Sequence, residues 1–267
     1  MKKRVISAVI LISLALPLVL EGKAVFALAI GMVGVFALKE VMDLKKSHSN
    51  IPAGMSLVIY LSFLFLLYCT PFEYSKMDGI NYQVMGILLL LYLLPVMFYA
   101  KTQEYQTSDA FYFLGVTFFL SLACHTIILA RVHSLWLFLY LVLIPVFTDT
   151  FAYFFGKLVG KRKVAPNISP NKTIEGCILG SFSSTVLCSI FYLNFVSPMK
   201  LWPLVLITLA LSVAGQFGDL FFSKMKRENE IKDFSNLIPG HGGILDRFDS
   251  HMIVALMFLL CMSFFNF

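Results

Sequence analysis

Long apolar runs separated by short polar segments dominate the chain. A helix needs about 20 residues, and at least about 17, to cross the hydrocarbon of a bilayer. The pattern therefore predicts an all-α polytopic integral membrane protein with about nine transmembrane helices. The nine runs are Val5–Leu20, Ala24–Leu38, Ala53–Pro71, Val84–Ala100, Ala110–Ala130, Ser134–Phe155, Ile174–Phe195, Leu201–Phe222 and Ser250–Phe265. The first two runs are short, which leaves open a tight or partly inserted hairpin around Glu21–Lys23.

Composition strengthens this interpretation and argues against a soluble domain and a nucleic-acid-binding protein. Of 267 residues, 59% are hydrophobic and 13% are charged, whereas soluble domains are about half apolar and about a quarter charged. The formal net charge of +6 comes with no arginine-rich arm and no nucleic-acid-binding signature, so we expect no nucleic-acid partner. The cysteines are scattered without CxxC spacing and are expected to be small apolar residues; they are Cys69, Cys124, Cys177, Cys188 and Cys261.

The distribution of basic residues predicts the orientation of the helices. Short cytoplasmic loops of membrane proteins carry an excess of lysine and arginine. With the amino terminus in the cytoplasm and the carboxyl terminus on the opposite side, 17 of the 21 basic residues are cytoplasmic. We expect an amino-terminal set of about five helices in residues 1–130 and a catalytic set in 131–267. The two long polar connections, 156–173 and 223–249, both fall on the cytoplasmic side, where chemistry is expected.

Four aspartates lie in or beside apolar runs, where an unpaired charge costs at least about 2.5 kcal/mol. Asp149 and Asp219 stand near the cytoplasmic ends of two predicted helices, and Asp246 and Asp249 are three residues apart at the head of the last one. A cluster of carboxylates without nearby thiols suits Mg²⁺ or Mn²⁺ better than zinc. The alternative is that individual aspartates cap helices or pair with Lys224, Arg227 or Arg247.

The surrounding residues have the composition of a phosphate-binding site. Gly240, Gly242 and Gly243 let backbone N–H groups approach a ligand, and they precede a helix whose amino end favours anions. Cationic donors that suit phosphate accompany them: Lys224, Lys226, Arg227, Lys232 and Arg247. His241 lies between glycines and can donate to phosphate.

A second polar cluster stands at a helix entrance, in Ser169–Gly176. It contains Ser169, Lys172 and Thr173. A helix cap explains Thr173 alone, but it does not explain the serine, lysine and glutamate together.

These residues carry a resemblance. The 27 residues from Ser223 to Asp249, SKMKRENEIKDFSNLIPGHGGILDRFD, match the carboxy-terminal signature of phosphatidate cytidylyltransferases, or CDP-diacylglycerol synthases. Asp149–Tyr153, Gly156 and Ser169–Gly176 also resemble that family. The motifs cover roughly the second half of the chain, whereas the first half agrees only in being a set of hydrophobic helices.

The resemblance implies a Mg²⁺-dependent enzyme of phospholipid biosynthesis in the cytoplasmic (inner) membrane, with its site facing the cytoplasm. CTP and phosphatidate would give CDP-diacylglycerol and pyrophosphate, by direct attack of a phosphatidate oxygen on the α-phosphorus of CTP. Asp219 and Asp246 are the first choices for metal ligands, followed by Asp249 and Asp149; Mn²⁺ is an alternative ion. Lys224, Arg227 and Arg247 would join the first two aspartates in catalysis. The predicted substrate-binding residues are Ser169, Lys172, Thr173, Ser223, Lys226, Lys232, Gly240, His241, Gly242 and Gly243.

Two other functions stay open at this point. An ion-coupled transporter also places carboxylates at membrane depth, but the polar residues here gather at one face instead of the midplane. A related enzyme acting on another lipid phosphate or an isoprenoid substrate would keep the metal site and change the lipid groove. The sequence also leaves open the number of metal ions, any monovalent cation, and association into a homodimer.

Overall fold

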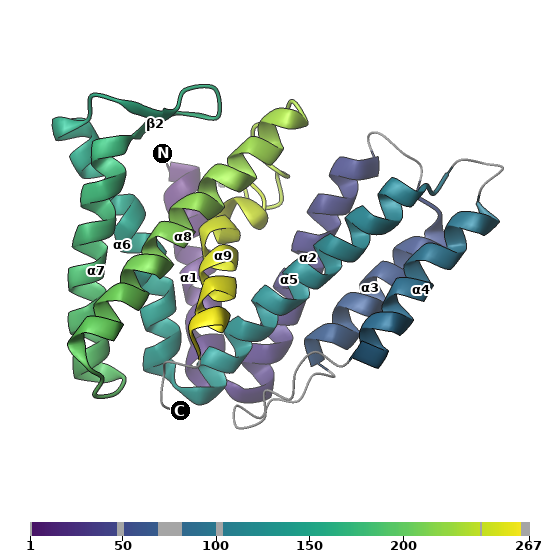
Figure 1. The fold of residues 1–267 in the computed structure, drawn as a ribbon, viewed down its shortest axis with the longest axis horizontal. Helices are drawn as coiled ribbons and strands as arrows, with labels where there is room; N and C mark the ends of the chain where they lie inside the picture. The colour runs from purple at the N-terminus through teal and green to yellow at the C-terminus, as the bar shows by residue number, and fades with distance from the viewer. Residues whose placement is uncertain (1, 47–50, 69–81, 100–103, 241, 263–267) are drawn as a thin grey trace. The chain divides into compact units, whose positions relative to one another are not determined.

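The computed structural model describes residues 2–46, 51–68, 82–99, 104–240 and 242–262, and the part it describes is mostly helical (Figure 1). Each apolar run predicted from the sequence corresponds to one α-helix. The helices are α1 (Lys2–Glu21), α2 (Lys23–Lys46), α3 (Ala53–Tyr68), α4 (Tyr82–Phe98), α5 (Thr107–His133), α6 (Leu135–Val159), α7 (Ile174–Phe195), α8 (Leu201–Glu228) and α9 (Leu245–Cys261).

Five of the described helices are long and apolar enough to cross a membrane: α2, α5, α6, α7 and α8. The first two helices are longer than their apolar runs, with 20 and 24 residues, because they continue into the charged segments beside those runs. α3 and α4 are shorter, with 16 and 17 residues. The architecture agrees with an all-α membrane protein.

A short β-hairpin departs from the all-α expectation. β1 (Lys163–Ala165) pairs antiparallel with β2 (Ser169–Thr173), with Lys163 opposite Thr173. The Glu175 carboxylate closes the base of the hairpin by accepting the backbone N–H groups of Lys161 and Arg162, at 3.0 and 3.2 Å. The polar cluster around Ser169 therefore lies at the entrance of α7, as predicted, but its first residues form a β-strand that the sequence did not predict.

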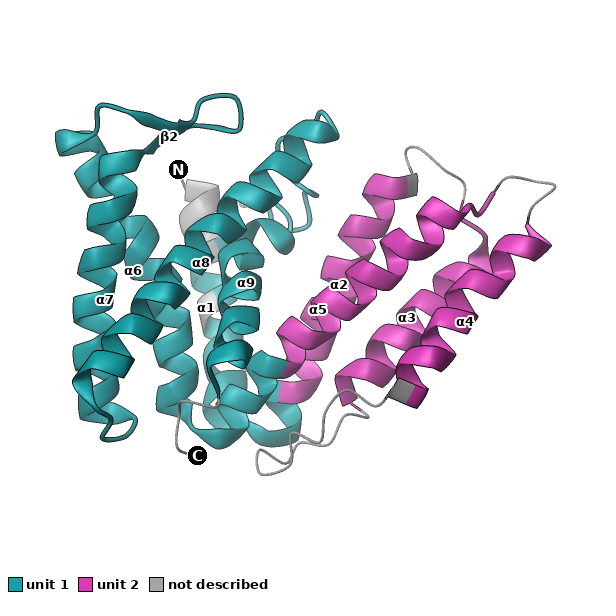
Figure 2. Ribbon diagram, in the orientation of Figure 1, with its two compact units in different colours: residues 1–26, 126–266 teal, residues 27–125, 267 magenta. Residues whose placement is uncertain are grey.

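The chain forms two compact units (Figure 2). Unit 1 comprises residues 1–26 and 126–266, and unit 2 comprises residues 27–125 together with residue 267. The expected division after residue 130 differs from this one in two respects: α1 belongs to the same unit as the carboxy-terminal helices, and that unit resumes at residue 126. The two predicted polar connections both belong to unit 1.

A half-buried arginine links α1 to the rest of unit 1. The Arg131 guanidinium donates to the carbonyl oxygens of Val19 and Leu20, at 2.7 and 3.0 Å. These carbonyls lie at the end of α1, where backbone acceptors have no intrahelical partner. Gly22 has φ +68° and lies against the same guanidinium. The contact fixes the α1–α2 turn beside the end of α5.

Glycines bring α6 and α7 close together in unit 1. Gly176 and Gly180 are four residues apart on α7, and a Cβ atom at Gly180 would lie 2.8 Å from the Thr148 carbonyl oxygen and from the Ala152 Cβ of α6. Gly156 of α6 lies on the same contact. Small residues at this spacing allow helix backbones to approach closely within a membrane. The side chains of Thr148 and Asp149 are thereby brought near α7.

Unit 2 is held together by polar contacts between its helices as well as by apolar packing. Tyr92 of α4 and Thr117 of α5 share a hydrogen bond of 3.0 Å between their hydroxyls. The His125 ring lies 3.0 Å from the Leu67 carbonyl oxygen, as expected for a packing histidine. Lys45 forms an ion pair of 3.0 Å with the buried carboxylate of Asp109.

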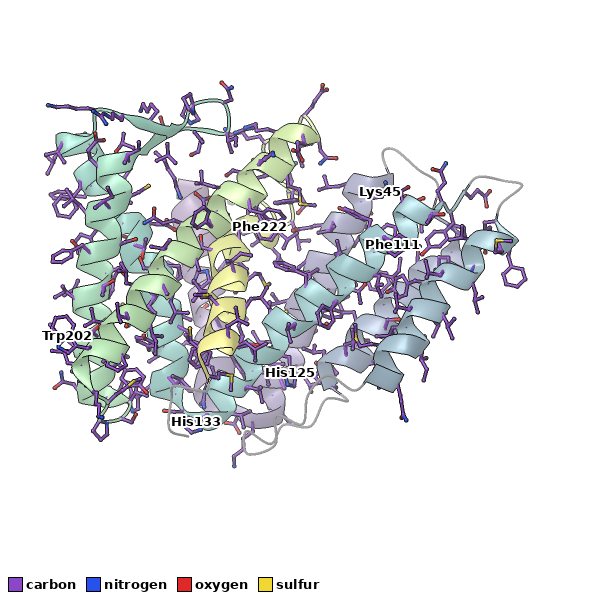
Figure 3. The ribbon with its side chains drawn as sticks, in the orientation of Figure 1. Lys45, Phe111, His125, His133, Trp202 and Phe222 are labelled. Atoms are coloured by element: carbon purple, nitrogen blue, oxygen red, sulfur yellow. The ribbon has the colours of Figure 1, made fainter. Side chains whose placement is uncertain are left out.

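Large apolar side chains also lie on the outside of the helices. Trp202 is 77% exposed and Phe111 is 56% exposed (Figure 3). Many other large apolar side chains are also exposed. Such a surface is typical of a protein that faces lipid. Cys124, Cys188 and Cys261 are buried and unpaired, as expected, while Cys69 lies outside the described residues.

Candidate active site

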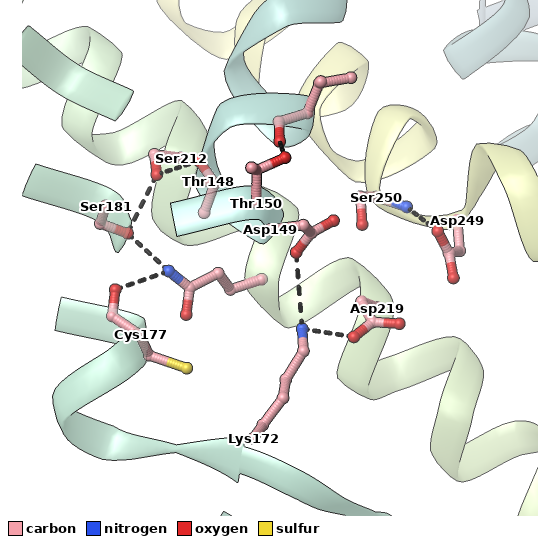
Figure 4. A network of polar contacts seen from close by, with 12 residues as sticks. Thr148, Asp149, Thr150, Lys172, Cys177, Ser181, Ser212, Asp219, Asp249 and Ser250 are labelled. Atoms are coloured by element: carbon pink, nitrogen blue, oxygen red, sulfur yellow. Dashed lines mark hydrogen bonds and ion pairs between the residues drawn. The ribbon is translucent and has the colours of Figure 1, made fainter. Parts of the chain in front are cut away.

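Two of the predicted aspartates meet at one ammonium group in unit 1. Lys172 on β2 contacts the carboxylate of Asp219 on α8, and its Nζ lies 3.8 Å from a carboxylate oxygen of Asp149 on α6 (Figure 4). The Lys172 side chain is 18% exposed, against 25% for Asp219 and 47% for Asp149. The hairpin and two helices thus converge on a half-buried cluster of opposite charges.

The environment keeps Lys172 protonated. Burial alone would lower the pKa of its ammonium group, but the charge and hydrogen bond of Asp219 and the charge of Asp149 outweigh burial and raise it. The side chain therefore carries a positive charge beside the two acids.

A third acid borders this pair. The Asp249 carboxylate on α9 interacts electrostatically with Asp219, Asp149 and Lys226. Figure 4 shows Asp149, Asp219 and Asp249 around the same space. Asp249 also accepts the backbone N–H of Ser250 at 2.7 Å. Three of the four predicted aspartates are therefore neighbours.

Asp246 occupies a different place from the one expected for a first-choice metal ligand. Its carboxylate is 4% exposed and accepts the Lys226 ammonium at 2.6 Å. The other oxygen accepts the backbone N–H groups of Phe234 and Gly243, both at 2.8 Å. Asp246 thus ties the end of α8 and two points of the following loop to the first turn of α9.

The glycine loop is shaped by this carboxylate. Gly240 and Gly242 have positive φ angles of 80° and 83°, which only glycine adopts readily. Ile238 donates its N–H to the Gly242 carbonyl at 2.9 Å. The Gly243 N–H already binds Asp246, so in this state it is not free for a phosphate. His241 lies outside the described residues.

Several predicted basic residues at the carboxyl end of α8 and in the residues that follow it have other contacts. Lys224 pairs with Glu228 at 3.5 Å, and the Arg227 guanidinium donates to the Ile231 carbonyl at 3.2 Å. Lys232 and Arg247 are exposed, and Ser223 is half-buried. Their roles toward substrate stay predictions.

Thr173 performs the capping role that its position predicted. Its hydroxyl accepts the Gly176 N–H at 3.2 Å at the start of α7. The side chain is 5% exposed and packs against Gly156 and Gly160. Ser169 is half-buried at the start of β2, opposite Ala165.

A buried network of hydrogen-bonded polar side chains lies near the acids, and it was not predicted from the sequence. Gln216 of α8 donates to the Ser181 hydroxyl at 2.7 Å and to the Cys177 carbonyl at 2.9 Å, both on α7. Ser212 donates to Ser181 at 3.0 Å and lies 2.6 Å from the Thr148 hydroxyl. A glutamine inside an apolar helix, three residues before Asp219, was a signal that could have revealed this network.

Cys177 is the cysteine that departs from the expectation of an apolar filler. It is half-buried and lies near the charged groups of Lys172, Asp149 and Asp219. Figure 4 shows Cys177 together with these three residues.

The acids suit a hard cation when part of the coordination comes from elsewhere. Within the described residues, no group of three or more histidine, cysteine, aspartate or glutamate side chains is arranged to hold a metal ion alone. Magnesium in nucleotide enzymes is commonly held by one or two carboxylates, substrate phosphates and water. Asp149 and Asp219 already share a positive charge at Lys172, so their oxygens fit that pattern.

The comparison with known proteins decides the family. The sequence pattern of the cytidylyltransferase family matches residues 2–265 of this chain. The chain belongs to the cytidylyltransferase family. The match covers the amino-terminal helices as well as the carboxy-terminal motifs.

Curated relatives span almost the whole of this cytidylyltransferase family member. A protein of Bacillus subtilis (strain 168) named phosphatidate cytidylyltransferase is 38% identical over 269 residues, which cover 98% of each chain. Proteins with the same name from Staphylococcus haemolyticus (strain JCSC1435) and Staphylococcus aureus (strain COL) are 34% identical over 257 and 263 residues. In both, the match covers 95% of this chain and 96% of the relative.

Proposed function

We propose that this chain transfers CMP from CTP to phosphatidate, giving CDP-diacylglycerol and pyrophosphate. The observation that carries the proposal is the convergence of Asp149, Asp219 and Lys172, from α6, α8 and the β-hairpin. The family match and the names of the relatives, which span nearly the full chain, supply the reaction. The acids and the basic groups supply the charges that a nucleoside triphosphate and a lipid phosphate require.

The reaction needs positioning and charge neutralisation more than a strong base. A phosphate oxygen of phosphatidate forms a bond to the α-phosphorus of CTP, and the bond from that phosphorus to the bridging oxygen of the β-phosphate breaks. Pyrophosphate takes the electron pair of the broken bond. The phosphate monoester is already anionic near neutral pH, so no side chain has to remove a proton from an alcohol.

Different charged side chains would position the substrates and neutralise their charge. Asp219, with Asp149 and Asp249 beside it, would hold Mg²⁺ or Mn²⁺, which would neutralise charge on the triphosphate when bound. Lys172, which contacts Asp219, and Lys226, which pairs with Asp246 and lies near Asp249, would orient phosphate oxygens. Asp246 would keep the loop 229–244 in place and reach the metal only by giving up Lys226 or a backbone N–H. Lys224, Arg227, Lys232 and Arg247 would attract CTP from the cytoplasm.

The position of the site explains how two unlike substrates meet. Phosphatidate stays in the bilayer, and CTP arrives from water. Helices α6, α8 and α9 contribute acids near the ends that the distribution of basic residues assigns to the cytoplasm. We infer an enzyme of the cytoplasmic membrane with its amino terminus and its active site on the cytoplasmic side.

The test is transfer of label from α-³²P-CTP to lipid in mixed micelles of the purified enzyme. We expect labelled CDP-lipid with phosphatidate and Mg²⁺, and none when EDTA replaces Mg²⁺. Transfer to another lipid phosphate, with none to phosphatidate, would overturn the substrate assignment. No transfer to any lipid phosphate by folded enzyme would overturn the reaction and direct attention to ion flux in sealed vesicles.

A further inference from the structure

Lys172 occupies the position between acids where a cation would bind. Its ammonium contacts Asp219 and lies 3.8 Å from Asp149, and Asp249 interacts with both acids. Three carboxylates this close together would repel one another without a positive charge between them. The lysine therefore supplies the compensation that lets α6, α8 and α9 bring their acids together before any ligand arrives.

The backbone that carries Lys172 is fixed on both sides. Lys163 pairs with Thr173 in the hairpin, and the Ile174 N–H donates to the Arg162 carbonyl at 2.9 Å. The Thr173 hydroxyl caps α7. The four-carbon side chain, by contrast, rotates about several bonds. The ammonium can therefore leave the acids without a movement of the hairpin.

A divalent cation and this ammonium compete for the same oxygens. Two cations in contact with one carboxylate repel each other strongly in a half-buried site, where the effective dielectric constant is well below that of water. The three ammonium protons can instead bind a phosphate oxygen. Arrival of a divalent cation thus frees a phosphate-binding group at the moment when a triphosphate has to be held.

We propose that Lys172 is a tethered counter-ion that occupies the cation position in the ligand-free enzyme and is displaced by the divalent metal. The proposal rests on the metal-binding role given above to Asp219 and Asp149. It predicts that removal of the lysine charge strengthens metal binding even though it weakens catalysis.

The experiment measures Mn²⁺ binding to purified enzyme in detergent without nucleotide, from the electron paramagnetic resonance signal of free Mn²⁺. We expect Lys172→Gln to bind Mn²⁺ at least about tenfold more tightly than the wild type. Lys163→Gln is the matched control, since Lys163 is an exposed lysine of the same hairpin, and it should bind as the wild type does. Lys172→Met repeats the test with an apolar side chain.

The outcomes separate the counter-ion from the metal site. Equal or weaker Mn²⁺ binding by folded Lys172→Gln and Lys172→Met, with binding still lost in Asp219→Asn, overturns the counter-ion and leaves the metal site in place. Mn²⁺ binding that does not depend on Asp219 in any variant overturns both.

A second measurement uses the wild-type protein. Acylation of lysines by a water-soluble active ester, followed by mass spectrometry, should show that Mg²⁺ increases modification of Lys172 severalfold and leaves Lys163 unchanged. Unchanged or reduced modification of Lys172 with Mg²⁺ would contradict displacement.

Discussion

The Thr148 hydroxyl of α6 lies 2.6 Å from the Ser212 hydroxyl of α8, deep in unit 1 where both side chains are buried. Thr148 directly precedes Asp149, and Ser212 is two turns before Asp219. The hydrogen bond therefore sets the relative height of the two helices that carry the acids. Ser181 and Gln216 extend the contact to α7, so the active-site acids stand on a polar layer shared by three helices.

Gln216→Ala should impair turnover without unfolding the protein. The variant loses the hydrogen bonds to Ser181 and the Cys177 carbonyl, each worth about 0.6 to 2 kcal/mol between membrane helices. We expect kcat to fall about tenfold because small displacements of reacting groups are costly, with little change in KM for CTP. Phe217→Ala, which removes a 65% exposed side chain next along α8, is the control. An unchanged kcat would show that the polar layer does not position the acids.

Asp219→Asn should lower kcat/KM at least about 100-fold, because it removes the carboxylate that Lys172 contacts and that is assigned to the metal. The folded protein should still be extracted in normal yield. Activity with a radiolabelled substrate and elution on size exclusion are the measurements. Lys161→Ala changes an exposed side chain and should retain near-normal activity; the same result for Asp219→Asn would refute the metal assignment.

Asp246→Asn should lose activity by a different route. The neutral amide binds Lys226 and the two backbone N–H groups less well than the carboxylate does, because hydrogen bonds to charged groups are about twice as strong. We expect faster cleavage within residues 229–244 by a soluble protease and a lower melting temperature. Asp219→Asn should show neither change. Equal protease resistance of the two variants would contradict the role of Asp246 in holding the loop.

Gly180→Ala should destabilise unit 1, since the added methyl would lie 2.7 Å from the Ala152 nitrogen and 2.8 Å from the Thr148 carbonyl oxygen. Overpacking of this kind costs about 1 to 3 kcal/mol. The matched change is Gly115→Ala in α5, where the new Cβ would have no neighbour within 4 Å. Thermal unfolding in detergent compares the two. A melting temperature of Gly180→Ala at or above that of Gly115→Ala would count against close packing of α6 and α7.

The helices could be predicted from the sequence because long apolar runs have few other structures open to them in a bilayer. The β-hairpin could not, since Lys163–Thr173 is short, charged and interrupted by Pro166 and Pro170, and shows no alternation of apolar residues. The hairpin forms because Glu175 and the cap at Thr173 bind backbone groups around it.

The same distinction applies to the site. The four aspartates could be identified as candidate site residues because an unpaired charge at membrane depth costs free energy. Three of them are neighbours in the structure. Asp246 lies apart from the other three because it binds two backbone N–H groups in the loop before α9. The sequence does not show which way those N–H groups point. The pairing of Lys172 with Asp219 likewise depends on the β-hairpin, which could not be predicted from the sequence.

The contact between Arg131 and the end of α1 bears on how the protein is made. Val19 leaves the ribosome 112 residues before its partner, an interval of roughly 5 to 25 seconds at ordinary rates of protein synthesis. During that time the carbonyls at the end of α1 lack their arginine cap. The contact can form only after α5 has been synthesised, so unit 1 joins the first helix of the chain to helices made much later.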